Sequence, residues 1–328
     1  MTEGEFDLIR RLFAPLAEKE PGAFGLEDDV AALLDTDFVA TKDALVAGVH
    51  FPEDERFDLI ARKALRVNLS DLAAKGAKPF GYLLGCVWPT DATSAEMEEF
   101  AAGLKQDQET YKITLLGGDT TRHRRAGAPL TLSVTMFGLG PRDGVVRRNG
   151  ARVGDDVYVT GTIGDAGLGL MAAQGEETFP SSDEAELHER LRLPSPRLRF
   201  GGALPGVASA AIDVSDGLVA DAGHLAAASG VAIEIDAARL PMSDAAIAWR
   251  ARQSDPDASI TALAGAGDDY EILFTAPPER RRAIDIASQV TKTSATKIGV
   301  ARSGHGVRLL NESGAQISLL RPGYDHFR

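Results

Sequence analysis

The sequence predicts an α/β protein of two domains. Its 328 residues are 44% hydrophobic, and a chain of this length usually divides into more than one hydrophobic core. Stretches with the two-residue period of a strand alternate along the chain with stretches of helical periodicity. We expect the segment from Pro141 to Asn149 to link a first domain, residues 1–145, to a second domain, residues 146–328.

The composition excludes several classes of protein. No apolar run approaches the roughly 18 residues that span a bilayer, and the acidic opening Met1–Phe6 lacks the features of a signal peptide, so we expect a cytoplasmic protein without a membrane partner. Its single cysteine, Cys86, excludes an intramolecular disulfide and a thiolate zinc cage, and its apolar neighbours predict a buried, inert thiol. A net charge of -13 argues against binding to nucleic acid.

In the first half, one helix organises the expected elements. Its apolar residues recur at helical spacing from Ile60 to Ala73, and Gly76 and Pro79 stop it. The capping box Thr93-x-x-Glu96 opens another helix, which runs to about Gln108. The remaining elements expected here are a helix over 6–16, an acid pair at 28–29 running into an apolar stretch to 33, and strands over 38–41, 82–88, 113–116 and 130–136.

In the second half, strands are followed by glycine-rich or acidic turns. Residues 157–161 form a strand that leads into the glycine-rich loop 162–170, a setting in which backbone N–H groups can approach a phosphate, although a lone loop of this kind is weak evidence. A strand over 210–212 ends in Asp213, Ser215 and Asp216, and a helix follows. Ser215 or Asp216 alone could simply cap that helix. Further strands are expected over 231–235 and 272–274, and residues 176–189 read as a polar, mobile segment.

The acidic residues at these positions predict a metal site. Asn68 and Asp71 share one face of an otherwise apolar helix, and a carboxylate there, with no fixed cation nearby, calls for a metal ion. Other acids stand at strand ends: Asp29, Asp43, Asp119, Asp213 and Asp216. Asp119 follows Gly117 and Gly118 in what we interpret as a tight turn at a strand end, although a plain hairpin turn is also possible. Oxygen-rich sites select Mg2+, and Mg2+ with glycine-rich loops indicates a nucleoside triphosphate and phosphoryl transfer. His50 taken alone is more typical of a structural histidine.

Taken together, these motifs resemble the thiamine-monophosphate kinases of the aminoimidazole ribonucleotide synthetase-like superfamily. The motifs that carry the resemblance lie at residues 4–6, 28–29, 45–51, 63–74, 117–121, 161–170, 212–218, 267–273 and 323–327. The resemblance implies two α/β domains, a homodimer formed through the N-terminal sheet, and ATP bound between the domains. The implied reaction transfers a phosphoryl group from ATP to thiamine monophosphate and yields thiamine diphosphate and ADP.

The resemblance also implies roles for individual residues. The implied Mg2+ ligands are Asp29, Thr41, Asp43, Asp71, Asp119, Asp213 and Asp216, of which Asp43, Asp71 and Asp213 are expected to be catalytic. The implied ATP contacts are Tyr111, Gly118, Asp119, Arg148 and Ser215, and the implied substrate contacts are His50, Asp268 and Arg321. The acceptor phosphate is already an anion, so the reaction needs positioning and charge neutralisation and no general base.

The sequence departs from the family pattern at four positions, which are Glu27, Lys42, Asp268 and Arg321. The ammonium of Lys42 could replace one metal beside Asp43 or project outward, and we favour the first arrangement. Two rival functions stay open. One is an ATP-dependent enzyme of the same superfamily with another acceptor, and the other is a nucleotide-binding regulator that has lost catalysis through Lys42.

Overall fold

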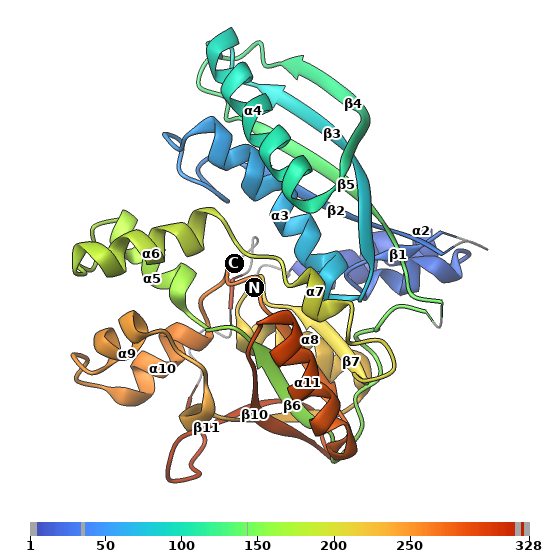
Figure 1. Ribbon diagram of the computed structural model, residues 1–328, viewed down its shortest axis with the longest axis vertical. Coiled ribbons are helices and arrows are strands. Elements are labelled where there is room, and N and C mark those ends of the chain that lie inside the picture. Colours follow the sequence, from blue (N-terminus) through green and yellow to red (C-terminus); the bar gives the residue numbers. More distant parts are fainter. Residues whose placement is uncertain (1–4, 34–36, 143, 319–322, 325–328) are drawn as a thin grey trace.

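Two β-sheets, each with helices packed against it, form the upper and lower halves of the molecule in Figure 1. This computed structural model describes residues 5–33, 37–142, 144–318 and 323–324. The first sheet has five strands in the order β1-β2-β5-β3-β4, and the second has six in the order β11-β8-β10-β6-β9-β7. The expected α/β fold with two sheets is therefore confirmed. The proposed boundary at residue 145 falls between the last strand of one sheet and the first strand of the other.

The first half begins with a helical segment and continues into the five-stranded sheet. Its elements are α1 (Glu5–Leu8), a π-helical turn (Ile9–Phe13), α2 (Ala14–Ala17), a 3-10 helix (Pro21–Leu26), β1 (Ala31–Ala32), β2 (Phe38–Val46), α3 (Phe57–Ala74), β3 (Lys78–Trp88), α4 (Ser94–Tyr111), β4 (Thr114–Arg122) and β5 (Thr131–Leu139). The expected capping box of α4 is present, since the Thr93 hydroxyl accepts from the Glu96 N–H and the Glu96 carboxylate accepts from the Thr93 N–H.

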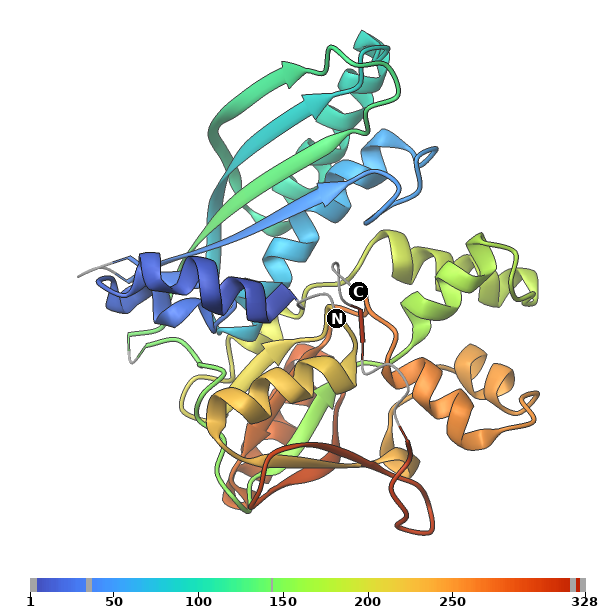
Figure 2. The same cartoon turned by 180° about the vertical axis from the view of Figure 1, so that it is seen from behind.

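Helix α3 is buried on almost every side because it lies between the two halves. It packs on β2, β3 and β5 of the first sheet and on α4, and it also contacts α7, β7 and β9 of the second half. These contacts explain why its sequence is apolar or small around most of its circumference, whereas a surface helix would have one polar face. The two long helices α3 and α4 cover one face of the first sheet, and the opposite face is open over most of its area (Figures 1 and 2).

Strand alternation assigns side chains to these two faces. Along β2, Thr41 and Leu45 are buried, whereas Lys42 and Ala44 are exposed. Cross-strand partners share a face, so Thr41 lies with Met136 of β5 on the helix-covered side. The first hydrophobic core fills that side. The thiol of Cys86 is buried in this core as expected, and burial raises its pKa to about 11.

The second half is a mainly antiparallel sheet with helices around it. Its elements are β6 (Asp156–Thr160), α5 (Asp165–Ala173), α6 (Ser181–Arg192), α7 (Leu198–Gly201), β7 (Ala210–Asp213), α8 (Leu218–Ser229), β8 (Ala232–Asp236), a 3-10 helix (Ala237–Arg239), α9 (Asp244–Arg250), α10 (Pro256–Ala264), β9 (Ile272–Ala276), a 3-10 helix (Pro278–Arg280), α11 (Arg281–Thr291), β10 (Ala295–Arg302) and β11 (Gly306–Leu310). Strands β6, β7 and β9 are buried along their whole length, in agreement with their continuous apolar character.

Three expectations about local structure are wrong. Asp43 does not stand at a strand end, because β2 continues through it to Val46. The glycines of Gly117–Thr121 do not form a turn at a strand end, because these residues lie within β4 and pair with β3. Gly118 is needed there for close approach, since a Cβ atom would lie 1.9 Å from the Leu84 carbonyl oxygen. The segment expected to be mobile contains α6, which buries Leu187 and Leu191 against the second half. None of the described helices is both long and apolar enough to cross a membrane.

Two helical glycines differ in the space around them, so we predict opposite effects on stability when each is replaced by alanine. A Cβ atom at Gly103 of α4 would lie 2.3 Å from the Asp58 carbonyl oxygen, whereas at Gly223 of α8 the nearest atom is 3.9 Å away. We expect Gly103→Ala to destabilise the protein by about 1–3 kcal/mol and the matched control Gly223→Ala to stabilise it by about 0.4–1 kcal/mol. Urea unfolding midpoints measure both effects. Equal midpoints for the two variants would contradict the close α3–α4 contact.

Candidate functional site

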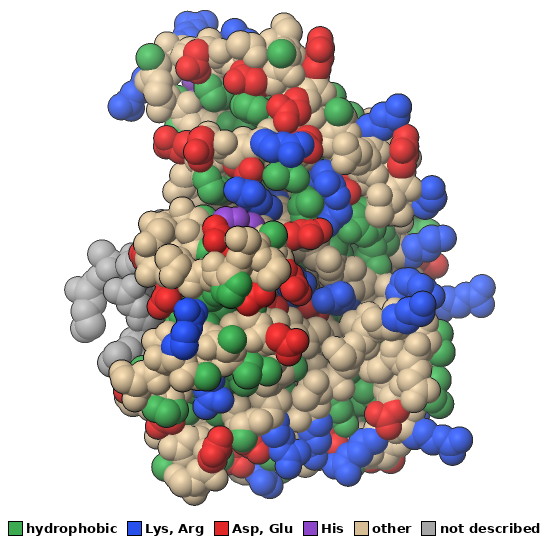
Figure 3. Space-filling view, turned by 60° about the vertical axis from the view of Figure 1, so that its left-hand side comes forward, with side chains coloured by type: hydrophobic (Ala, Val, Ile, Leu, Met, Phe, Trp, Pro, Cys, Tyr) green, Lys and Arg blue, Asp and Glu red, His purple; other side chains and the backbone are tan. Residues whose placement is uncertain are grey.

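Carboxylates from distant parts of the chain converge where α3 meets the second half. Asp29 comes from the turn before β1, Asp71 from the last turns of α3, and Asp213 from the end of β7, and one carboxylate oxygen of each lies within 4.8 Å of the other two. The Thr41 hydroxyl of β2 donates a hydrogen bond to Asp71. The charge of Asp43 acts on Asp71 and Asp213, and that of Asp216 acts on Asp43, so we count both residues in the same acid cluster. Figure 3 shows acidic side chains gathered at the level where the halves meet.

Burial and mutual repulsion raise the pKa values of this cluster. Burial and then the charges of Asp43 and Asp213 hold the pKa of Asp71 well above its ordinary value. Burial is also the main cause at Asp43, whose pKa is raised to about 6, and at Asp213, whose pKa is raised to about 7. No described lysine, arginine or histidine forms an ion pair with Asp43, Asp71 or Asp213. These three carboxylates therefore fit the expectation of a cation supplied from outside the chain.

Asp28 and Asp29 have the fixed cations that the other acids lack. Lys75 is fully buried, and its ammonium lies 2.9 Å from an Asp28 oxygen and 2.6 Å from an Asp29 oxygen. Arg147 pairs with Asp28 at 2.6 Å, and the guanidinium of Arg148 pairs with Asp29. The acidic pair is thus tied to the end of α3 and to the chain that enters the second half. Sequence reasoning missed Lys75, because nothing local distinguishes it from a solvated lysine at a helix end.

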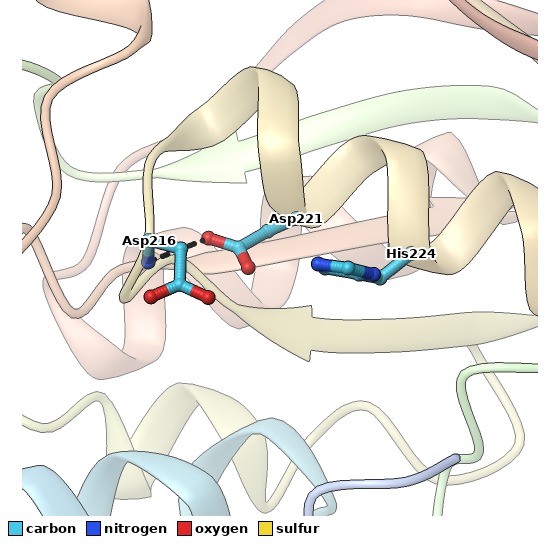
Figure 4. A group of neighbouring side chains, drawn as sticks. All are labelled: Asp216, Asp221 and His224. Carbon is cyan, nitrogen blue, oxygen red and sulfur yellow. Dashed lines mark hydrogen bonds between the residues drawn. The ribbon is translucent and has the colours of Figure 1, made fainter. Parts of the chain in front are cut away.

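A second group of potential ligands flanks the acid cluster. Asp216, Asp221 and His224 each present an atom within 4.8 Å of the other two (Figure 4). The carboxylate of Asp221 accepts hydrogen bonds from the N–H groups of Ser215 and Asp216, both at 3.1 Å. Neither Ser215 nor Asp216 caps α8, whose N-cap is Gly217 with no side-chain bond. Asp221 and His224 share a helix face at i and i+3, a signal that the sequence contained.

His224 is a half-buried histidine. Its ring contacts that of Phe6 from the N-terminal helix, with the ring centroids 3.9 Å apart and the ring planes tilted by 35°. Burial, aided by the charge of Arg148, lowers its pKa to about 4. The helix that opens the chain is therefore fastened to the second half beside the acid cluster.

A cavity of about 400 Å³ lies between the two halves. It is lined by His50 and Asp268, two of the three expected substrate contacts, and by Lys63 of α3, which forms an ion pair with Asp268 at 3.1 Å. The third expected contact, Arg321, lies outside the described residues. The Nδ1 atom of His50 accepts from the Val46 N–H, so this histidine also holds its own loop.

Three expected site residues are not brought to the acid cluster within one chain. Asp119 pairs through Gly85 and Ser133 with Ala44, which puts it on the open face of the first sheet. Three strand spacings of about 4.8 Å separate it from β2. Gly118 is its neighbour on the same exposed edge strand. Tyr111 lies at the end of α4, where the guanidinium carbon of Arg66 is 5.6 Å from its ring centroid.

Lys42 projects away from the acid cluster. It is exposed, and alternation along β2 puts it on the face opposite Thr41. The expectation that its ammonium replaces a metal is therefore wrong, although its charge still lowers the pKa of Asp43 against the larger effect of burial. The departure from the family pattern at this position leaves the acid cluster intact.

The glycine-rich loop after β6 is already held by the protein. Asp269 accepts from the N–H groups of Gly164 and Ala166 at the start of α5, at 2.7 and 3.4 Å. Gly161 packs against Glu271, which is fully buried and bound by Arg190 and Arg197. The expectation that this loop offers free N–H groups to a phosphate is wrong at Gly164, because the Asp269 carboxylate occupies that position.

Comparison with known proteins identifies both halves. Residues 27–140 match the profile of the AIR synthase related protein, N-terminal domain, and residues 152–310 match that of the AIR synthase related protein, C-terminal domain. The chain is 43% identical over 325 residues to the thiamine-monophosphate kinase of Caulobacter vibrioides, covering 98% of this chain and 90% of that one. It is 38% identical over 333 residues to the thiamine-monophosphate kinase of Escherichia coli K12, covering 100% and 99%.

Solved structures agree with this similarity. The structure of AaThiL complexed with AMPPCP and TMP superposes with a TM-score of 0.84 at 33% identity, covering 99% of this chain and 97% of that one. The hydrogenase maturation protein HypE in complex with ATP superposes with a TM-score of 0.70 at 18% identity, which shows the same fold.

The raised pKa of Asp213 predicts how stability depends on pH. Between its ordinary value of 3.8 and about 7 the folded state binds more protons at this group than the unfolded state, so its contribution to stability falls as the pH rises. Asp213→Asn removes the charge. Without ligands, we expect this variant to exceed the wild type in stability at pH 8, by an amount on the order of 2–4 kcal/mol, and to match it at pH 4. Denaturant titrations at both pH values measure this difference.

The matched control is Asp285→Asn, since Asp285 is exposed on α11. We expect the control to follow the wild type at both pH values. A constant difference between Asp213→Asn and the wild type from pH 4 to pH 8 would contradict the assignment of Asp213 to a repelling cluster.

Proposed function

The chain belongs to the AIR synthase related proteins, among the thiamine-monophosphate kinases, and we propose that it transfers the γ-phosphoryl group of ATP to the phosphate of thiamine monophosphate. The products are thiamine diphosphate and ADP. The observation that carries this proposal is the convergence of carboxylates between the halves, of which Asp43, Asp71 and Asp213 form no ion pair with a described lysine, arginine or histidine. Full-length similarity to thiamine-monophosphate kinases supports the choice of acceptor.

The donor set of the acid cluster fits Mg2+. All its donors are oxygen atoms, and three of its carboxylates lack a cation within the described chain, which is the chemistry that a hard divalent ion satisfies. The residues that would hold Mg2+ in one chain are Asp29, Thr41, Asp43, Asp71, Asp213 and Asp216. Bound there, Mg2+ would neutralise the charges of the two phosphate groups that must approach each other.

The chain itself contributes position and charge to the reaction. An acceptor phosphate oxygen forms a bond to the γ-phosphorus as the bond to the β,γ-bridging oxygen breaks, and ADP leaves with that electron pair. The acceptor is anionic, so no side chain has to remove a proton. Thr41 fixes the orientation of Asp71, and Asp221 fixes the loop of Ser215 and Asp216. Arg148 and Ser215 are proposed to contact ATP.

We propose that the enzyme is a homodimer associated through the first sheet. Leu83, Leu115 and Leu116 are exposed on β3 and β4, and every residue of β4 is exposed. An exposed apolar strand at a sheet edge is suited to pairing with a second copy. Asp119 and Gly118 of one chain would then complete the site of the other chain, which accounts for their distance from the acid cluster of their own chain.

Two narrower features are part of the proposal. The enzyme consumes ATP, so we propose that it is located in the cytoplasm. We also propose that the chain divides into domains of residues 1–145 and 146–328. The rival function of a regulator without catalysis loses its main support, because Lys42 faces away from the carboxylates.

The proposed reaction is tested by ADP release. The wild type should release ADP with thiamine monophosphate and Mg2+ and not with either absent. Asp71→Asn should lower kcat at least about 100-fold, because it removes a carboxylate on which phosphate neutralisation depends, and should leave the melting temperature unchanged or higher. The control Asp91→Asn, at an exposed position, should keep wild-type kcat. An active Asp71→Asn enzyme would overturn the role of the acid cluster.

Sharing of sites between copies is tested by mixing two inactive variants. Asp119→Ala and Asp71→Asn should each be inactive alone. A hybrid dimer contains one site with Asp71 from one chain and Asp119 from the other, so unfolding and refolding the two variants together should restore activity, up to half the wild-type value per hybrid. No recovery in a mixture that sedimentation confirms as dimeric would overturn the sharing of Asp119.

A further inference from the structure

The cavity between the halves has few charges, and they occur in pairs. Its lining comes from the loop after β2, from α3, from the α5–α6 region and from the turns near Asp268. The charged lining residues are Glu55, Lys63, Arg192 and Asp268. Arg192 pairs with Glu55 at 2.7 Å, and Lys63 pairs with Asp268 at 3.1 Å. Each pair joins one half of the molecule to the other.

The two cationic side chains of the cavity, Arg192 and Lys63, differ in how deeply they are buried. The side chain of Arg192 is 39% exposed, whereas that of Lys63 is 4% exposed. Lys63 therefore presents the ammonium of the inner wall, and Arg192 lies at the rim. The partner of Lys63 is less confined, because the Asp268 side chain is 33% exposed while its N–H is fixed to the Ser215 carbonyl oxygen at 2.8 Å. The carboxylate of Asp268 can turn toward solvent without moving the backbone.

Among the cavity-lining residues of α3, Lys63 is the closest in sequence to Asp71. It and Asp71 are eight residues apart on α3, about 12 Å along the helix axis. The turn that carries Asp268 connects the two regions, because the N–H groups of Asp268 and Tyr270 donate to the carbonyl oxygens of Ser215 and Val214 at 2.8 and 2.7 Å. The ion pair of Lys63 with Asp268 is therefore tied to the segment that brings Asp213 and Asp216 to the acid cluster.

The phosphate group of the acceptor needs a positive charge beside it in this cavity. A phosphate monoester carries a charge of about -1.5 to -2 at neutral pH, and the nearby carboxylates repel it. A buried ammonium is a fixed positive charge with three donors, and a dianion competes well with a single carboxylate for it.

We infer that Lys63 binds the phosphate of the acceptor, and that Asp268 holds this ammonium until the phosphate displaces it. This inference rests on the proposed function. It assigns Lys63 the selection of a phosphorylated acceptor over its unphosphorylated form. The N–H groups of Lys63 donate to acceptor oxygens other than the one that forms the new bond to phosphorus.

The test compares binding of thiamine monophosphate, thiamine and MgATP by calorimetry. Lys63→Met should weaken thiamine monophosphate binding about 10–100-fold, the usual effect of a lost charge-assisted hydrogen bond, and should change the Kd values of thiamine and MgATP less than threefold. The control Lys105→Met removes an exposed ammonium from α4 and should leave all three Kd values unchanged.

A second variant tests the displacement. Asp268→Asn frees the ammonium, so the ratio of the thiamine Kd to the thiamine monophosphate Kd should rise above the wild-type ratio. A contact between Asp268 and the thiamine ring system would change both Kd values together and cancel in this ratio. The double variant Lys63→Met/Asp268→Asn leaves no unpaired charge, and it should show the same low ratio as Lys63→Met.

The outcomes separate this inference from the proposed function. If Lys63→Met keeps the wild-type ratio while the wild type releases ADP with thiamine monophosphate, Lys63 does not bind the phosphate and the kinase assignment stands. If the wild type neither binds thiamine monophosphate nor releases ADP with it, the proposed function fails first. A ratio unchanged by Asp268→Asn overturns the displacement by Asp268.

Discussion

Repulsion among carboxylates at the end of α3 is the constraint on which the site depends. Asp29, Asp71 and Asp213 come within 4.8 Å of one another in a buried region, and Asp43 adds its charge. The buried Lys75 pairs with Asp28 and Asp29, and Arg148 pairs with Asp29 and also lowers the pKa of Asp213 against the larger effect of burial. The remaining charge is relieved by protonation, which the raised pKa values reflect, or by a bound cation. The protein thereby couples the stability of its interface between halves to ligand binding.

Helix α3 connects the acid cluster with both halves of the molecule. It presents Lys63 to the cavity and Asp71 to the acid cluster, and it ends at Lys75. Its position is fixed on the other side by Arg66, which pairs with the fully buried Asp107 of α4 at 2.6 Å. A side chain on a helix packed on nearly every side has little freedom to shift. This rigidity suits a reaction that depends on positioning two anions rather than on moving protons.

The two faces of the first sheet have different roles in the proposed enzyme: one contributes to the acid cluster, and the other is the proposed dimer surface. Thr41 lies on the helix-covered face, whereas Lys42 and Asp119 lie on the open face. A one-residue change of register would exchange these groups, because side chains alternate along a strand. The full backbone pairing of β2 with β5 therefore supports the site as directly as any ion pair.

The sequence by itself determined the elements whose signals are local. Alternation in β5, the capping box of α4 and the apolar spacing of α3 lie within a few neighbouring residues, and the same patterns placed Asp213 at the end of a strand. Only the tertiary structure decided how distant groups combine. It paired Lys75 with Asp28 and Asp29, brought Asp221 to the backbone of Ser215, and stabilised α6 through Leu187 and Arg190. It also incorporated Gly117–Thr121 into a strand. Such contacts join residues far apart in the chain, so their energies depend on strand order and helix packing and leave no periodicity in the local sequence.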